Sequence, residues 1–110
     1  MIQNDKYMRE GMPGVSYEQK IALLTRALRN LFGITQADLA TLSNTSRPTI
    51  SRLEKLSGDR LARLDTLERI LGVFRERGVE VTFDGEDIVL RLTHDTLRTA
   101  VKSVRGEDNH

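Results

Sequence analysis

The stretch from Thr35 to Glu54, TQADLATLSNTSRPTISRLE, constrains the fold more than any other part of the chain. Its pattern predicts two short helices joined by a tight turn. Thr35 is suited to cap the first helix, with Asp38 three residues on as its capping-box partner. Asn44 stands where the chain must turn, and asparagine enters the left-handed backbone region at modest cost. Ser46 is suited to cap the second helix.

The second helix of this stretch is predicted to have a buried and an exposed face. Pro48 is tolerated in its first turn because the first N–H groups of a helix have no intrahelical partner. Ile50 and Leu53 are three residues apart and are expected to point into the core. The side chains left to face outward are those of Arg47, Thr49, Ser51 and Arg52.

These residues resemble the helix-turn-helix of the lambdoid phage repressor and Cro class, often called the XRE family. The matching positions are Thr35-Gln36, Leu39-Ala40, Asn44, Ser46, Ile50 and Leu53-Glu54. The chain departs from the family at Asn44, where glycine is usual, and at Ser43, where an apolar residue is usual. The resemblance covers residues 16–76 and implies a regulator that reads double-stranded DNA through a recognition helix at 46–56.

The resemblance also implies which residues touch DNA. Those expected at base edges in the major groove are Ser46, Arg47, Pro48 and Arg52. Arginine pairs best with guanine, so guanines are expected in each half-site. Those expected at phosphates are Thr35, Gln36, Thr49, Ser51 and Lys55. At the start of the first helix, free N–H groups and the positive end of the helix dipole favour a phosphate.

Two longer helices are predicted to flank the motif. Ser16 with Gln19 predicts a capped helix over 16–32 that ends at Gly33. Its apolar stripe is Ile21, Leu24, Leu28 and Leu31. Arg26 and Arg29 are expected on its outer side, either in solvent or within reach of phosphate.

The second flanking helix is predicted over 65–77, capped by Asp65 and stopped by Gly78. Its buried stripe is Leu67, Ile70, Leu71 and Phe74. With the motif helices at 36–43 and 47–56, the two flanking helices would enclose one small apolar centre.

After Gly78 the pattern changes to alternation, which predicts a β-hairpin turning at residues 84–87. Thr93 is suited to cap a last helix. The expected fold is therefore mainly α: a four-helix, repressor-like core followed by a C-terminal hairpin and a short helix. The expected division is a flexible arm at 1–15, a DNA-binding domain at 16–78 and an extension at 79–110. Lys6 and Arg9 of the arm are expected in solvent more than on DNA.

The net charge of +1 does not by itself point to DNA, but its distribution does. Residues 16–60 carry seven basic and four acidic groups, whereas residues 61–110 carry eight basic and ten acidic groups. The positive excess therefore accompanies the helix-turn-helix, as expected for a half that faces phosphate.

Several classes of protein are disfavoured. The chain has no cysteine and two widely separated histidines, so a zinc site is not expected. The acids at 84–87 do not match a calcium loop. No catalytic constellation or phosphate loop is present in the sequence, so neither an enzyme nor a cofactor is expected. No apolar run approaches the ~20 residues that span a membrane, and a cytoplasmic location is expected.

Three functions remain open. The leading one is a repressor that binds a palindromic operator. The second is an antitoxin that represses its own operon and holds a toxin on another surface, and the third is a protein–protein module such as an anti-activator. Outward Arg47 and Arg52 argue against the third.

A homodimer is expected because a single helix-turn-helix contacts few base pairs. The apolar residues assigned to its interface are Val79, Val81, Phe83, Ile88, Leu90, Leu92, Leu97 and Val101. The alternative is that this segment folds back on its own core.

Overall fold

The structure is a computed structural model, and it describes residues 14–56 and 62–106. Three parts of the chain lie outside the described residues. They are the predicted arm up to residue 13, the Ser-Gly-Asp run at residues 57–59, whose composition predicts a break after the second motif helix, and the polar tail beyond Gly106. Within the described residues, no helix is long and apolar enough to cross a membrane.

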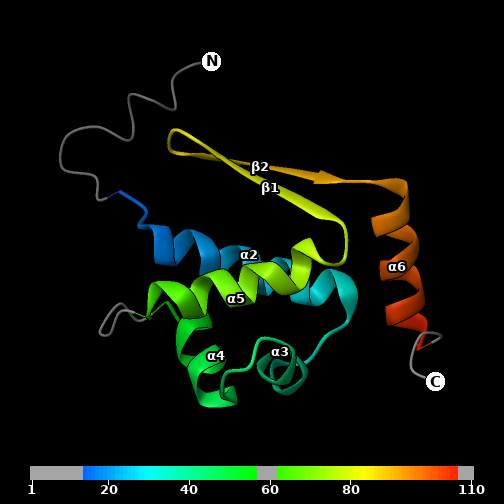
Figure 1. Ribbon diagram of the computed structural model, residues 1–110, viewed down its shortest axis with the longest axis horizontal. Helices are drawn as coiled ribbons and strands as arrows, with labels where there is room; N and C mark the ends of the chain where they lie inside the picture. The colour runs from blue at the N-terminus through cyan, green and yellow to red at the C-terminus, as the bar shows by residue number, and fades with distance from the viewer. Residues whose placement is uncertain (1–13, 57–61, 107–110) are drawn as a thin grey trace.

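The described elements follow the predicted order. They are α2 (Tyr17–Phe32), α3 (Gln36–Leu42), α4 (Arg47–Glu54), α5 (Leu64–Arg75), β1 (Val79–Asp84), β2 (Asp87–Leu92) and α6 (His94–Arg105). Figure 1 shows α2 and α5 alongside each other, with α3 and α4 on one side of them and the hairpin on the other. The last helix, α6, stands at one end of this arrangement and contacts α2. The predicted fold class is confirmed.

The predicted caps of the first helices are also confirmed. Ser16 and Gln19 form a capping box on α2, and Gly33 ends this helix in the left-handed conformation. Thr35 and Asp38 form a second capping box on α3. These reciprocal bonds satisfy N–H groups that have no partner inside the helix, which is why each helix begins where it does.

The predicted cap of α5 was wrong. This helix begins at Leu64 after Arg63, whose side chain makes no cap hydrogen bond. Asp65 lies inside the first turn, where its carboxylate accepts hydrogen bonds from Arg63 at 3.1 Å and from Arg69 at 3.2 Å. Two guanidinium groups thus attract the carboxylate that the sequence pattern assigned to a cap.

The hairpin pairs antiparallel with Val79 opposite Leu92, Val81 opposite Leu90 and Phe83 opposite Ile88. These pairs share one face of the sheet because directly opposite residues point to the same side. Within this face the β1 residues are the more deeply covered, since Val79 and Val81 are buried whereas Leu90 and Leu92 are exposed. The hairpin therefore packs on the helices mainly through β1.

The hydrophobic core extends beyond the four helices that were expected to enclose it. The largest fully buried side chains include Phe32, Phe74 and Ile50 from the helices, and the same cluster contains Val79, Val81 and Ala100. The alternative in which the last segment folds back on its own core is thus realised in part. The helices, β1 and one face of α6 share a single core.

Gly78 sits at the point where the chain turns from α5 into β1. Its φ of +91° lies in the region that favours glycine. A Cβ at this position would lie 2.5 Å from the hydroxyl oxygen of the buried Thr96 on α6. Glycine is therefore required both by the turn and by the close approach of α6.

Candidate DNA interface

The helix-turn-helix consists of α3, the turn at residues 43–46, which contains Asn44, and α4. Asn44 has a φ of +56°, so it adopts the left-handed conformation predicted for it. The Ser46 hydroxyl accepts a hydrogen bond from the Thr49 N–H at 3.2 Å, which confirms it as the cap of α4. Ile50 and Leu53 are buried in the core. Their burial fixes which face of α4 remains in solvent.

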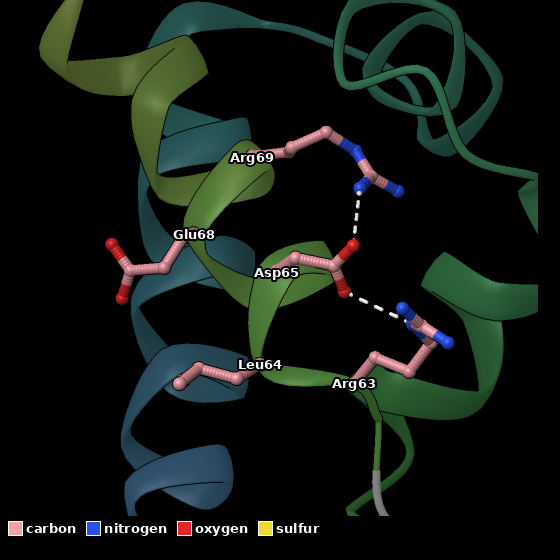
Figure 2. Close-up of a pocket in the computed structure, with 5 residues that line it drawn as sticks. All are labelled: Arg63, Leu64, Asp65, Glu68 and Arg69. Carbon is pink, nitrogen blue, oxygen red and sulfur yellow. Dashed lines mark hydrogen bonds and ion pairs between the residues drawn. The ribbon is translucent and has the colours of Figure 1, made fainter.

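Arg69 of α5 forms hydrogen bonds with the turn between α3 and α4. The Arg69 guanidinium donates to the carbonyl oxygens of Ser43 at 3.0 Å and Asn44 at 3.4 Å. It also donates to Asp65 at 3.2 Å, and Figure 2 shows Asp65 between Arg69 and Arg63. The bond to Arg63, with the charges of both arginines, lowers the pKa of Asp65 below its ordinary value. Arg69 thus satisfies carbonyls that the end of α3 leaves without helical partners.

The environment of Ser43 explains one of the two positions at which the sequence departs from the family pattern. Ser43, which stands where an apolar residue is usual, is buried and donates its hydroxyl hydrogen to the carbonyl of Leu39 at 2.7 Å. A hydroxyl paired in this way can occupy an apolar site without a large penalty.

A buried ion pair attaches α4 to α2. Arg29 donates to the two carboxylate oxygens of Glu54 at 2.8 and 2.9 Å and to the carbonyl of Ile34 at 3.0 Å. The side chains of Arg29 and Glu54 are only 18% and 6% exposed. Gln36 of α3 donates to the same carboxylate at 3.1 Å. One carboxylate therefore connects three helices of the candidate interface.

The ionisation of Glu54 follows from these contacts. Burial by itself would raise the pKa of this carboxyl group, but hydrogen bonds from Arg29 and Gln36 and the charges of Arg29 and Arg26 outweigh burial and lower the pKa. The pKa of Arg29 is raised, chiefly by the same hydrogen bond. Both groups therefore stay charged, and the negative charge of Glu54 is neutralised inside the protein.

The outward face of α4 is consequently positive. Arg47, Pro48, Arg52 and the adjacent Lys55 are exposed, whereas Glu54, the one acidic residue of this stretch, faces inward. A helix with two exposed arginines on one face, next to a lysine, has the charge and the donors that phosphates and base edges require.

The remaining residues assigned to DNA lie around this face. Ser46 and Thr35 are exposed, and Gln36, Thr49 and Ser51 are half-buried. The hydroxyl groups of Ser46 and Thr49 lie 2.8 Å apart and are hydrogen-bonded to each other. Gln36 is the first residue of α3, and its side-chain amide nitrogen is already bonded to Glu54. Of the nine residues assigned to DNA, six are thus exposed and three are half-buried.

Arg29 is a correction to the sequence analysis, which expected it on the outer side of its helix, in solvent or within reach of phosphate. Its bidentate bond to Glu54 makes it a residue that joins helices. The 25-residue separation of the two partners gave no local signal of this pairing. Arg69 was missed for the same reason, because its contacts with the turn span 25 and 26 residues.

The eight residues assigned to a dimer interface do not share one environment. Val79 and Val81, at 2% and 9% exposure, are already covered by their own protomer, which corrects their assignment to an interface. Phe83 and Ile88 are partly buried against the core, and the Phe83 ring lies 5.2 Å from that of Tyr17. The members that remain exposed are Leu90, Leu92, Leu97 and Val101, and Val104 extends the exposed stripe on α6.

Two depressions accompany these elements on the described surface. One, of about 850 Å³ and widely open, is the depression drawn in Figure 2, lined by Arg63, Leu64, Asp65, Glu68 and Arg69. The other, of about 330 Å³, lies between the ends of α2 and α3, with Arg77 and Ser103 among its lining residues. The first is lined by the charged network that holds the turn.

Comparison with known proteins agrees with this geometry. A family model described as helix-turn-helix matches residues 26–80, half of the chain, from within α2 to the start of β1. No curated protein and no solved structure matches the chain. The matched segment contains α3, α4 and both residues, Arg29 and Arg69, that secure them. The chain therefore belongs to the XRE-type helix-turn-helix family of DNA-binding transcription regulators.

Proposed function

We propose that the protein is a repressor that binds a palindromic operator as a homodimer, with α4 of each protomer in the major groove. The observation that carries this proposal is the outward face of α4, where Arg47 and Arg52 are exposed while Glu54 is turned inward and paired. Two such helices related by a two-fold axis would read half-sites about one DNA turn, ~34 Å, apart. A cytoplasmic location belongs to the same proposal.

The direct test is selection of bound sequences from random DNA duplexes by the full chain. We expect the recovered sites to be palindromic and to contain guanine in each half-site, because arginine donates two hydrogen bonds to guanine O6 and N7. Recovery of sequences without a common element would contradict the proposal of a sequence-specific operator.

Arg52→Ala is expected to weaken binding to the selected site by about 1–3 kcal/mol and to relax the sequence preference at one position. Arg52 is exposed, so the melting temperature should change little. Binding is measured by fluorescence anisotropy on the selected duplex and on duplexes that carry each of the other bases at the guanine. An equal loss of affinity for every duplex would identify Arg52 as a phosphate contact instead.

Gln36→Ala is expected to weaken binding to the selected and to an unrelated duplex by the same factor, because a phosphate contact carries no sequence information. This variant also loses the hydrogen bond to Glu54, so its unfolding must be measured alongside. Gln36→Glu would keep a side chain of the same size while repelling phosphate, but its carboxylate would also stand beside that of Glu54, so its unfolding must be measured too. If neither variant alters binding to either duplex, Gln36 does not contact the DNA backbone.

The homodimer is tested by light scattering on the intact protein without DNA. We expect twice the protomer mass of 12.5 kDa at tens of micromolar. A second candidate function is an antitoxin. The observation that favours it is the exposed apolar stripe of Leu97, Val101 and Val104 on α6, which offers a surface to a protein partner. In that case the stripe would hold a toxin. A monomer in solution would count against the homodimer.

A further inference from the structure

The second strand of the hairpin has an edge that no described strand pairs with. Among the described residues the sheet consists of β1 and β2 alone, so β2 has β1 on one side and no described strand opposite the N–H and C=O groups of its other side. Such an edge is a site for pairing with another chain, and proteins usually protect it with charge, proline or a bulge. The middle of this strand, between the charged residues Asp87 and Arg91, is Val89, which is 51% exposed on the solvent face.

The sequence of β2 is complementary to itself when it is read in opposite directions. Val89 lies at the centre of the run of residues 87–91. One large aliphatic residue flanks it on each side, Ile88 and Leu90, and the ends carry opposite charges, Asp87 and Arg91. In an antiparallel pair of two such strands centred on Val89, position 87 of one strand stands opposite position 91 of the other.

We propose that β2 pairs antiparallel with β2 of a second copy of this chain, with Val89 of the two copies facing each other across the two-fold axis. The result is a four-stranded sheet in the order β1, β2, β2, β1. This inference rests on the proposed homodimeric repressor for its role, and it names the surface and register of the dimer.

Charge favours this register over its neighbours. Arg91 already pairs with Glu80 of β1 at 3.1 Å on the solvent face, and in this register it also stands beside the partner's Asp87. Arg91 of each protomer thus lies between its own Glu80 and the partner's Asp87, and the two-fold axis repeats this arrangement. Centring the pair on Leu90 would set Arg91 opposite the partner's Val89, and centring it on Ile88 would set it opposite the partner's Gly85. Both shifts lose the two ion pairs.

The apolar face is compatible with the register that charge selects. Phe83 stands opposite Ile88 within the hairpin, and Ile88 would stand opposite the partner's Leu90. The apolar row would thus continue across the junction at Ile88 and Leu90 of each protomer. Leu92 would stand opposite the partner's Glu86, so α6, which begins at His94, would start beside the partner's hairpin turn.

A single cysteine tests the two-fold axis. The chain has no cysteine, so a disulfide formed by Val89→Cys can only join two copies. Facing residues of an antiparallel pair have Cα atoms about 4.5–5.5 Å apart, within the range that a disulfide bridges. We expect Val89→Cys to form a covalent dimer under mild oxidation. The matched control is Thr82→Cys, which lies opposite Val89 on β1 and one strand away from the junction, and should remain uncrosslinked.

Charge reversal tests the register independently. Arg91→Glu alone would set two acids opposite each other at both ends of the junction, and Asp87→Arg alone would set two arginines there. Each variant is expected to dimerise tenfold or more weakly than the natural chain. A mixture of the two should form a heterodimer, because each junction then again joins an acid to an arginine. Glu80→Gln removes only the ion pair within the protomer and should remain dimeric.

These outcomes separate the inference from the function on which it rests. A dimer in which Val89→Cys does not crosslink, or in which mixing the charge variants restores nothing, overturns the β2 junction even if operator binding is intact. A monomeric natural chain also overturns it. If the variants crosslink and the charge mixture restores the dimer, but the chain selects no DNA sequence, the β2 junction is supported and the proposed repressor function is contradicted.

Discussion

Replacing Arg29 by methionine is expected to lower the free energy of unfolding by about 3–5 kcal/mol, because it leaves Glu54 charged and nearly buried without its bidentate partner. Methionine is similar in length, so the loss would reflect charge and hydrogen bonding rather than a large cavity. The measurement is urea unfolding followed by circular dichroism at pH 7. The double variant Arg29→Met/Glu54→Leu should recover most of the loss, since replacing both members of a buried pair by apolar residues is often nearly neutral.

The dependence of this effect on pH has a definite sign. In the natural protein the pKa of Glu54 is lowered, so its contribution to stability is present above about pH 4.3, the ordinary glutamate value, and is lost as the pH falls through the folded-state pKa. In Arg29→Met, burial dominates and raises that pKa, so the charged form destabilises the fold. The difference in stability between the two proteins should therefore shrink from pH 7 to pH 4. A difference that is constant with pH would show that Glu54 is not the origin of the effect.

Truncation after Gly78 is expected to abolish cooperative unfolding. The deletion removes Val79, Val81 and Ala100 from the shared core and uncovers the helix side chains that they contact. Each fully buried valine contributes about 1.5–3 kcal/mol, and the total stability of a domain is about 5–15 kcal/mol. The fragment 1–78 should therefore show a broad, non-cooperative transition in urea.

A second truncation separates the hairpin from the last helix. The fragment 1–92 retains β1 and β2 and loses only α6, whose buried side chains are Thr96 and Ala100. It should unfold cooperatively at a lower urea concentration than the full chain. If the fragment 1–78 instead unfolds as sharply as the full chain, the four helices form an independent unit and the segment after Gly78 is an appendage.

Local rules were sufficient to predict most of the fold from the sequence. Ser16, Thr35 and Ser46 act within three residues of themselves, so their caps could be read directly. Asn44 was predictable because few residues enter the left-handed region. The outward residues of α4 followed from the spacing of Ile50 and Leu53, and the resemblance to the family then supplied their expected contacts with DNA.

Interactions between distant residues were not predictable in the same way. Arg29 reads as an outward residue on the pattern of α2, and only the folded chain shows that Glu54 lies within hydrogen-bonding distance. Asp65 satisfies the rule for a cap, but two arginines compete for its carboxylate. Alternation predicted the apolar face of the hairpin correctly, yet it could not show that β1 is covered by the helices while β2 is left exposed. That difference depends on the position of the sheet over α2 and α5.

The hydrogen bonds of Arg69 with the turn and of Arg29 with Glu54 have an evolutionary consequence. The turn is fixed by α5 and the end of α4 by α2, so the exposed positions of α4 that we propose to face DNA are not needed to maintain the geometry. Arg47, Pro48 and Arg52 are therefore free to change without loss of the scaffold. If α4 reads DNA as proposed, a lineage with this architecture can acquire a new operator through a few substitutions on one helix, and duplicated copies can diverge to control separate genes.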